Sequence, residues 1–260
     1  MKRKLLTLFI PLILAYAFVA NIQPAKAAEA LTGTNINAQP ALKMVFQDEF
    51  NTATVNASKW MNQLQWGRTN GSELQYYATN AFSFVSGILR VKADKKATNG
   101  KPYTSGALIT YKSFRFTYGI VEIKARVPAG KGLWPAFWLL DYAGDTAEID
   151  MMELLGHEPN VTYMTLHYAS PSGNQNPGTY YKGPNFSSGF HVFKVDWNAS
   201  RIIWYVDGAE RYRQTSHIPS KPMYLILNLA VGGDWPGAPD STTKFPAYLD
   251  IDYVRIYQPQ

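Results

Sequence analysis

The chain has 260 residues, no cysteine and a formal net charge of +6 at pH 7. Without cysteine no disulfide bond can hold the fold together, so a chain of this length must rely on a sizeable buried core. The first 27 residues contain four of the 25 Lys and Arg and none of the 19 Asp and Glu, so the remainder carries 21 minus 19, or +2. This near-neutral remainder lacks the basic footprint of a nucleic-acid-binding protein.

The N-terminus has the pattern of a secretory signal peptide. Basic residues at positions 2–4 precede an apolar run over 5–20, and Ala25-Lys26-Ala27 supplies the small residues of a cleavage site. We therefore expect residues 1–27 to be removed and the protein to be secreted, outside the cell or into a periplasm, with no membrane contact after cleavage. The alternative is a membrane anchor, which the short run and the lack of a second apolar segment of spanning length disfavour.

The rest of the chain is predicted to contain one all-β domain. Residues 28–42 are polar and aperiodic, which predicts a flexible arm, and residues 43–260 are predicted to form this domain. Apolar and polar side chains alternate over 121–127, 162–168 and 190–197, as in half-buried strands. Asp207-Gly208 predicts the turn of a β-hairpin, whereas 171–184, rich in Ser, Gly, Asn and Pro, is predicted to be a loop. Many short strands without helical periodicity indicate a sandwich or jelly roll.

Three carboxylates lie within six residues in the sequence Glu148-Ile149-Asp150-Met151-Met152-Glu153. In a regular strand Glu148 and Asp150 share one face, while Glu153 points to the opposite, apolar face. Burial of that carboxylate is costly, and a β-bulge around Met151 and Met152 restores the parity. We therefore expect a bulge that places all three acids on one surface, and we expect removal of Met152 to turn Glu153 inward.

Two glutamates on one strand surface can bring their carboxyl groups to about 5–5.5 Å, the separation that retaining glycosidases use. Crowding raises the pKa of at least one carboxyl group, so that an ionised nucleophile and a protonated acid are both available. By spacing alone, an acidic strand at a sheet surface or a calcium site explains the motif as well.

Aromatic residues suggest a carbohydrate cleft, because sugar rings have apolar faces and polar edges. Trp134, Trp138 and Trp235 lie in stretches interrupted by Gly and Pro, where exposure to a cleft is expected. Trp60 is expected in the core. Trp197 and Trp204 lie within alternating strands, where the core and a functional site are equally plausible.

The acidic segment resembles the catalytic signature of glycoside hydrolase family 16, in the bulged form typical of laminarinases. Seven further segments resemble blocks of this family, in the family's order, and together they cover nearly all of the chain after the leader. They are Gln47-Asp48-Glu49-Phe50, Glu73-Leu74-Gln75-Tyr76-Tyr77, Gly132-Leu133-Trp134-Pro135-Ala136-Phe137-Trp138, Thr165-Leu166-His167-Tyr168, Trp204-Tyr205-Val206-Asp207-Gly208, Gly232-Gly233-Asp234-Trp235-Pro236-Gly237 and Asp252-Tyr253-Val254-Arg255-Ile256-Tyr257.

The resemblance implies a β-jelly roll of two antiparallel sheets with a concave substrate cleft, and endo-hydrolysis of β-1,3-glucan with retention at the anomeric carbon. It makes Glu148 the nucleophile and Glu153 the acid/base, with Asp150 holding and tuning the nucleophile through a short hydrogen bond. The matching positions imply substrate contacts by Glu73, Trp134, Trp138, His167 and Trp235.

Two further points follow from the resemblance. His167 is expected to hydrogen-bond near the acid or the bound sugar, and its alternative is a core histidine. Many relatives carry an arginine near Ser105-Gly106-Ala107, where this chain has none, so one subsite contact is absent or supplied elsewhere.

No cofactor is expected for catalysis. The resemblance implies a structural calcium ion on the convex face, bound by the carbonyl oxygens of Glu49 and Gly87 and by the carboxylate and carbonyl of Asp252, with water completing the coordination. The four histidines are scattered, which argues against zinc.

The expected protein is therefore a secreted, monomeric endo-β-1,3-glucanase whose partner is a β-glucan, with mixed-linkage β-1,3-1,4-glucan as a further substrate. Two alternatives remain. One is an agarase-like or carrageenase-like galactan hydrolase of the same family, although sulfated substrates call for a more basic cleft than +2 indicates. The other is a non-hydrolytic β-glucan-binding protein, although such relatives usually lack one of the three carboxylates.

Overall fold

The structure, a computed structural model, describes residues 41–144 and 147–260. The predicted signal peptide (1–27) and the predicted arm as far as residue 40 lie outside the described residues. The first strand begins at Leu42, the last residue of the predicted arm, which pairs with Pro259. None of the described segments forms a helix of the length and apolarity that crossing a membrane requires.

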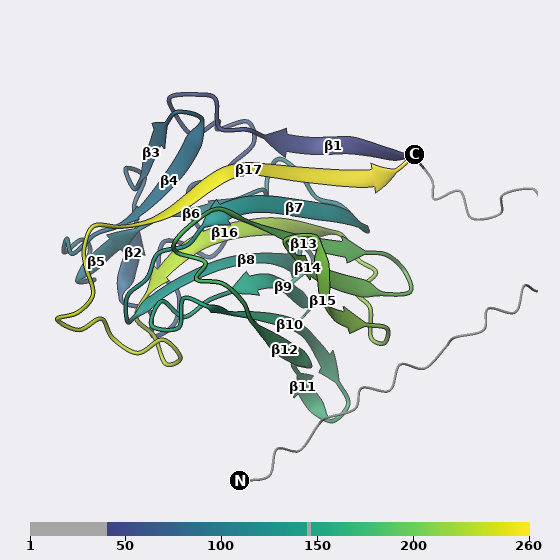
Figure 1. The fold of residues 1–260 in the computed structure, drawn as a ribbon. Coiled ribbons are helices and arrows are strands. Elements are labelled where there is room, and N and C mark those ends of the chain that lie inside the picture. Colours follow the sequence, from purple (N-terminus) through teal and green to yellow (C-terminus); the bar gives the residue numbers. More distant parts are fainter. Residues whose placement is uncertain (1–40, 145–146) are drawn as a thin grey trace, which may run out of the picture. The chain divides into compact units, whose positions relative to one another are not determined.

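Two large antiparallel sheets form the predicted jelly roll (Figure 1). The eight-stranded sheet has the order β15-β14-β13-β7-β17-β4-β3, and β1 pairs with β17 beside this path. Its strands are β1 (Leu42–Asp48), β3 (Phe82–Val85), β4 (Ile88–Ala93), β7 (Gly119–Arg126), β13 (His191–Trp197), β14 (Ile202–Val206), β15 (Ala209–Gln214) and β17 (Ala247–Pro259).

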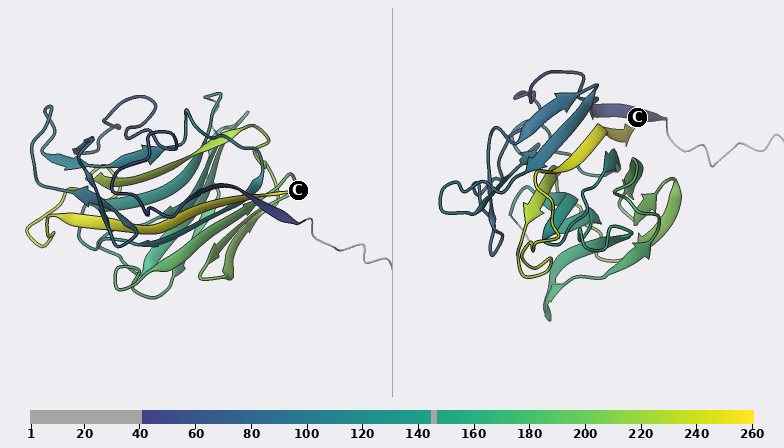
Figure 2. Two further views of the ribbon diagram at one scale, coloured as in Figure 1. Left: turned by 90° about the horizontal axis from the view of Figure 1, so that it is seen from above. Right: turned by 60° about the vertical axis from the view of Figure 1, so that its left-hand side comes forward.

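The seven-stranded sheet contains the acidic segment, which forms β9 between β8 and β10 (Figure 1). Figure 2 shows the same ribbon from two further sides. Its order is β11-β10-β9-β8-β16-β6, and β12 also pairs with β10. Its strands are β6 (Ala107–Ile109), β8 (Leu133–Asp141), β9 (Glu148–Glu153), β10 (Val161–Ser170), β11 (Gly173–Gln175), β12 (Gly178–Lys182) and β16 (Met223–Val231). The short strands β2 (Gln75–Tyr77) and β5 (Tyr103–Ser105) pair in parallel.

The main core lies between the two large sheets and follows from the alternation of the strands. Along β7, buried and half-buried residues alternate without a break, as the sequence predicts. The core contains Trp60, as predicted, and also Trp197 and Trp204, which are 1% and 0% exposed. Of the two alternatives for Trp197 and Trp204, the core and a functional site, the structure shows the core for both.

A second, smaller apolar cluster lies on the other face of the seven-stranded sheet. Here the irregular segment around Leu64 and Tyr77 packs against β6 and against Tyr224 and Ile226 of β16. Because this segment covers only one part of that face, the remainder stays accessible beside β8, β9 and β10.

One local expectation is wrong. Residues 171–184 are not a loop, because 173–175 and 178–182 are strands. Both pair with β10, which is long enough to form hydrogen bonds with each of them. The aromatic stretch with Trp134 and Trp138 is a regular strand, β8, in spite of Pro135. Both tryptophans are half-buried because they share one face of that strand.

Candidate active site

The predicted bulge is present in β9. Glu153 pairs with Ala136 and Met152 with Phe137 of β8, whereas Asp150 pairs with Trp138, the very next residue. Met151 is therefore the extra residue, and the register against β10 shifts at the same place. The shift lets the two methionines face the core together, at 2% and 0% exposure, while Glu148 and Glu153 stay half-buried at the opposite face.

The same register contradicts the expected effect of removing Met152. Loss of either methionine leaves Glu-Ile-Asp-Met-Glu, in which plain alternation already keeps all three acids on one face. The bulge compensates for the additional residue, and removal of that residue removes the need for it. The removal is therefore expected to straighten β9 and not to turn Glu153 inward.

Two adjoining cavities lie over this face of the sheet, with volumes of about 250 Å³ and 580 Å³. Glu148, Glu153 and Trp134 line both cavities, so the two glutamates stand where one cavity meets the other. Every predicted substrate contact lines at least one cavity: Glu73 and Trp138 the smaller, His167 and Trp235 the larger. The fold thus brings the predicted acids and substrate contacts together from β8, β9, β10 and two loops.

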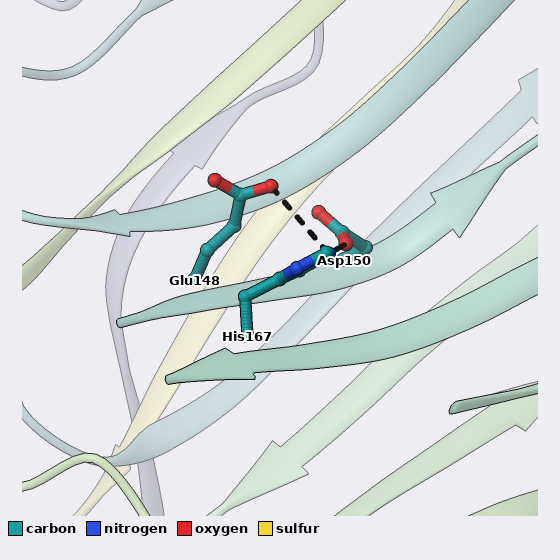
Figure 3. A group of neighbouring side chains, drawn as sticks. All are labelled: Glu148, Asp150 and His167. Atoms are coloured by element: carbon teal, nitrogen blue, oxygen red, sulfur yellow. Dashed lines mark hydrogen bonds and ion pairs between the residues drawn. The ribbon is translucent and has the colours of Figure 1, made fainter. Parts of the chain in front are cut away.

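Asp150 is the most enclosed of the three acids, at 2% exposure, and it is held by a histidine. Its Oδ2 lies 2.8 Å from Nε2 of His167 on β10, and the same nitrogen is 4.0 Å from Oε1 of Glu148 (Figure 3). His167 pairs directly with Glu148 across the two strands. His167 is therefore not a core histidine. It contacts Asp150 and lies near Glu148, whereas the sequence suggested a hydrogen bond near the acid/base Glu153 or the bound sugar.

Glu153 belongs to an aromatic wall. Nε1 of Trp134 donates to its Oε1 at 3.2 Å. The ring of Trp134 meets the ring of Trp235 edge-on at 5.6 Å, and Tyr163 packs against Trp235 at 4.8 Å. This packing fixes the tryptophan whose ring nitrogen donates to Glu153, so the carboxyl group has a hydrogen-bond donor held in a fixed position.

Glu73 is embedded in a hydrogen-bond network at the end of the smaller cavity. Its carboxylate accepts bonds from the side chains of Asn70, Gln75 and Tyr77. The network continues through Asn228, which donates to the Tyr77 hydroxyl and accepts from Nε1 of Trp138 at 2.8 Å. Glu73 is 5% exposed, so it shapes this cavity mainly by holding its neighbours in place.

Burial raises the pKa of all three acids of β9. Burial, and then the charge of Asp150, raises the pKa of Glu148 to about 9. The pKa of Asp150 is raised to about 6, mainly by burial and then by the charge of Glu153. The pKa of Glu153 is raised to about 7, mainly by burial and then by the charge of Glu148. A hydrogen bond joins Glu148 and Asp150, so these two carboxyl groups share a proton at neutral pH. The hydrogen bond to Asp150 also raises the pKa of His167.

These shifts predict that the acids destabilise the fold at high pH. Above about pH 4.5 the unfolded chain releases the protons of these carboxyl groups, whereas the folded protein keeps them. The contribution of the three acids to the free energy of unfolding is therefore complete below that pH, and it is lost as the pH rises through about 6, 7 and 9. Glu148→Gln removes one of these charges. We expect it to raise the free energy of unfolding by on the order of 1–3 kcal/mol at pH 9 and to change it little at pH 4.

Urea unfolding from pH 4 to pH 9 measures this difference. Glu210→Gln is the matched control, because that carboxylate is exposed and its pKa is lowered by Arg213. Parallel pH curves for the Glu148→Gln variant and the unchanged protein would show that Glu148 is not forced to hold a proton by the fold.

Several cavity-lining residues were missed in the sequence. Trp66, Asn70, Tyr77 and Asn228 line the smaller cavity, and Tyr163, Asn176, Thr179 and Tyr180 line the larger one. Tyr163 left a usable signal, since it lies two and four residues before Thr165 and His167 on the same face of an alternating strand, and Tyr77 lies in a segment that resembles a block of the family. No Lys or Arg is among the described residues that line these two cavities, so the arginine missing near Ser105 is not replaced there.

Comparison with known proteins places this geometry among glucan-acting enzymes. Residues 54–255 match the model of a family described as Glycosyl hydrolases family 16. The chain is 34% identical over 247 residues to a β-glucanase of Rhodothermus marinus, an alignment that covers 84% of this chain and 86% of the relative.

Solved structures agree in fold and sequence. The endo-β-1,3-glucanase of Pyrococcus furiosus is 36% identical with a TM-score of 0.75, over 84% of this chain and 95% of that one. The laminarinase catalytic domain of Thermotoga petrophila RKU-1 is 32% identical with a TM-score of 0.78, over 85% of this chain and 100% of that one.

Proposed function

The chain belongs to glycosyl hydrolases family 16, and we propose that it is a retaining endo-glycosidase that hydrolyses laminarin-type β-1,3-glucan and also mixed-linkage β-1,3-1,4-glucan. The observation that carries the proposal is the place of Glu148 and Glu153, both half-buried at the junction of two cavities whose lining includes aromatic, polar and acidic side chains and no Lys or Arg among the described residues. A glucan chain that runs through both cavities presents one glycosidic bond to this pair. The activities after which these relatives are named, β-glucanase and laminarinase, support the same substrate.

Each glutamate has a distinct role in the proposed double displacement. Glu153, with its carboxyl group held by Trp134, protonates the departing glycosidic oxygen while Glu148 attacks the anomeric carbon and forms a glycosyl ester. Glu153 then takes a proton from a water molecule, which attacks the same carbon and releases Glu148. Two inversions at one carbon give net retention.

The proton of the Glu148–Asp150 pair must leave the nucleophile before the first step. Burial and the charge of Asp150 raise the pKa of Glu148, whereas attack requires this carboxylate to be ionised. The positive charge that develops at the anomeric carbon in the transition state stabilises the Glu148 carboxylate as it attacks. Asp150 is hydrogen-bonded to Glu148 and to His167, and it takes the proton that Glu148 gives up.

The cleft chemistry favours a neutral substrate. A sulfated galactan needs cations beside its sulfate groups, and the described lining residues of the two cavities include no Lys or Arg. A neutral galactan such as agarose meets no such objection, and the names of the relatives are the argument for glucan over agarose.

The test is product analysis on laminarin, lichenan and agarose side by side, with the anomeric configuration of the new ends followed by NMR. We expect oligosaccharides of several lengths from laminarin, fewer products from lichenan and none from agarose, with β ends formed first. Cleavage of agarose but not laminarin would favour the galactan hydrolase. Binding of laminarin without any cleavage would favour the non-hydrolytic binding protein.

We further propose a structural calcium ion at Glu49, Gly87 and Asp252. Strand register brings the three positions together, since β17 pairs Ile251 with Leu89 and Val254 with Asp48. Asp252 is the residue at which the register of β17 against β7 shifts. Three carbonyl groups and one carboxylate are oxygen ligands of the kind calcium prefers.

The cation must compete with a lysine at this site. Nζ of Lys124 lies 2.7 Å from Oδ2 of Asp252, so calcium binding has to displace an existing ion pair. We expect millimolar calcium to raise the Tm relative to EDTA, and we expect Asp252→Asn to abolish that rise while Lys124→Met enlarges it. Differential scanning calorimetry measures all three, and a rise that survives in the Asp252→Asn variant would place the ion elsewhere.

Secretion and a monomeric state complete the proposal. The leader pattern of residues 1–27 supports export to the extracellular space or a periplasm. N-terminal sequencing of the exported protein, with Ala28 expected first, and light scattering of the purified chain test these two points.

A further inference from the structure

A tryptophan of the opposite sheet binds the backbone of the catalytic strand. Trp204 lies on β14 in the eight-stranded sheet and is 0% exposed. Its Nε1 donates a hydrogen bond of 2.7 Å to the backbone oxygen of Asp150 on β9, in the seven-stranded sheet. The bond therefore crosses the core between the two sheets, 54 residues apart in the chain.

This bond is unusual for a residue inside a strand. A strand carbonyl normally points sideways, within the sheet, and accepts a bond from the neighbouring strand. The carbonyl of Asp150 accepts a bond from a side chain in the facing sheet. The bulge accounts for this, because Met151 is the extra residue that follows Asp150 and the register shifts there. Trp204 thus supplies a hydrogen-bond donor to a buried carbonyl group at the bulge.

We propose that Trp204 is a positioning residue for catalysis, which holds the bulge of β9 and thereby sets the orientation of Asp150 toward His167 and Glu148. The proposal rests on the proposed function in assigning Glu148 as nucleophile. Trp204 lines neither cavity and acts only through the backbone of β9. Trp204 binds the backbone oxygen of Asp150, and the side chain of this same residue places its Oδ2 2.8 Å from Nε2 of His167. A rotation of that peptide group therefore moves the hydrogen bonds of Asp150.

The chain offers a matched control in Trp197. It lies on the adjacent strand β13, is 1% exposed, and its Nε1 also donates to a backbone oxygen, that of Pro219 at 3.0 Å. Pro219 belongs to the segment between β15 and β16 and not to β9. Trp197→Phe and Trp204→Phe therefore remove the same donor and similar volume from the same core, and only the second touches the catalytic strand.

The first measurement is steady-state hydrolysis of laminarin, well below the Tm of both variants. We expect Trp204→Phe to lower kcat on the order of 10-fold with little change in KM, because a small displacement of the reacting groups affects the transition state more than ground-state binding. Its pH profile is expected to shift, because the proton shared by Glu148 and Asp150 is held differently. Trp197→Phe is expected to lower the Tm but to keep kcat and the pH profile.

The second measurement does not depend on activity. The NMR titration of the His167 imidazole reports its bond to Asp150, which is the largest cause of the raised His167 pKa. Trp204→Phe is expected to move this pKa toward its ordinary value, and Trp197→Phe is expected to leave it in place. If the unchanged protein cleaves no glucan, the proposed function fails, while this titration still decides the role of Trp204.

A third variant separates the lost donor from a lost fold. Benzothienylalanine at position 204 keeps the ring shape and replaces the N–H by sulfur, so it removes the bond without a cavity. It is expected to reproduce the lower kcat and the shifted His167 titration. Equal kinetic and NMR behaviour of the position-204 and position-197 variants, or an unchanged benzothienylalanine protein, would overturn the proposal.

Discussion

Removal of the Glu148 carboxylate is expected to lower kcat on laminarin roughly 10,000-fold and to leave laminarin binding largely intact. Glu148 lies at the junction of the two cavities and is 4.0 Å from His167, so its loss removes the attacking atom while the aromatic walls that bind the sugars remain. The kinetic variant is Glu148→Ala, which also opens space on the nucleophile's side of the anomeric carbon.

Azide tests the role itself. In the Glu148→Ala variant, azide can enter the vacated space and attack the anomeric carbon while Glu153 still protonates the leaving group. This single displacement on a β-linked substrate gives an α-glycosyl azide, which NMR identifies. Glu210→Ala, on an exposed part of β15, serves as the control and is expected to keep full activity and to form no azide product. A β-azide from the Glu148→Ala variant would reverse the assignment.

Removal of the Glu153 carboxylate is expected to act differently on different leaving groups. Glu153→Ala is expected to lower kcat/KM on laminarin by on the order of 1,000-fold, because the departing sugar oxygen needs a proton. An aryl β-glucoside oligomer with a nitrophenolate leaving group needs no such proton, so its first step is expected to stay within about 10-fold of the unchanged enzyme. A burst of nitrophenol, followed by slow turnover, measures the two steps separately.

Azide again gives a diagnostic product in this variant. The glycosyl ester on Glu148 still forms, and azide replaces the water that Glu153 no longer activates. Two displacements at one carbon give a β-glycosyl azide, opposite to the product of the Glu148→Ala variant. Trp134→Phe removes the hydrogen bond from the indole nitrogen to the Glu153 carboxyl and keeps an aromatic side chain, so it is the partner variant that tests how far this bond tunes the acid. Equal losses on laminarin and on the aryl substrate would show that Glu153 is not the general acid.

The catalytic strand shows how far local pattern extends. The parity of Glu148, Asp150 and Glu153 predicts a bulge, and the register of β9 against β8 confirms it at Met151. The bulge is predictable because the alternation of faces depends only on consecutive residues. The expected effect of removing one methionine is nevertheless wrong. The strand has one residue more than alternation allows and the bulge compensates for it, so a strand without that residue needs no bulge to keep the three acids on one face.

Other parts of the cleft depend on partners that are distant in the chain. Residues 173–182 read as a loop by composition, and only their pairing with β10 makes them strands and places Tyr180 at the larger cavity. Asn228 lies in a strand that is buried throughout, so nothing in the local sequence shows that it meets Trp138 and Tyr77.

By itself, the sequence determined that an acidic strand with one additional residue lies in an all-β chain behind a leader pattern, because those features follow from the order of neighbouring residues. The tertiary structure alone decided which side chains surround the acids: Trp66 and Asn228 on one side, Tyr163 and Tyr180 on the other, and Trp204 behind. The physical reason is that strand pairing and sheet stacking join segments across tens to hundreds of residues, and these long-range contacts, not local alternation, set the burial, the hydrogen bonds and hence the pKa of each acid.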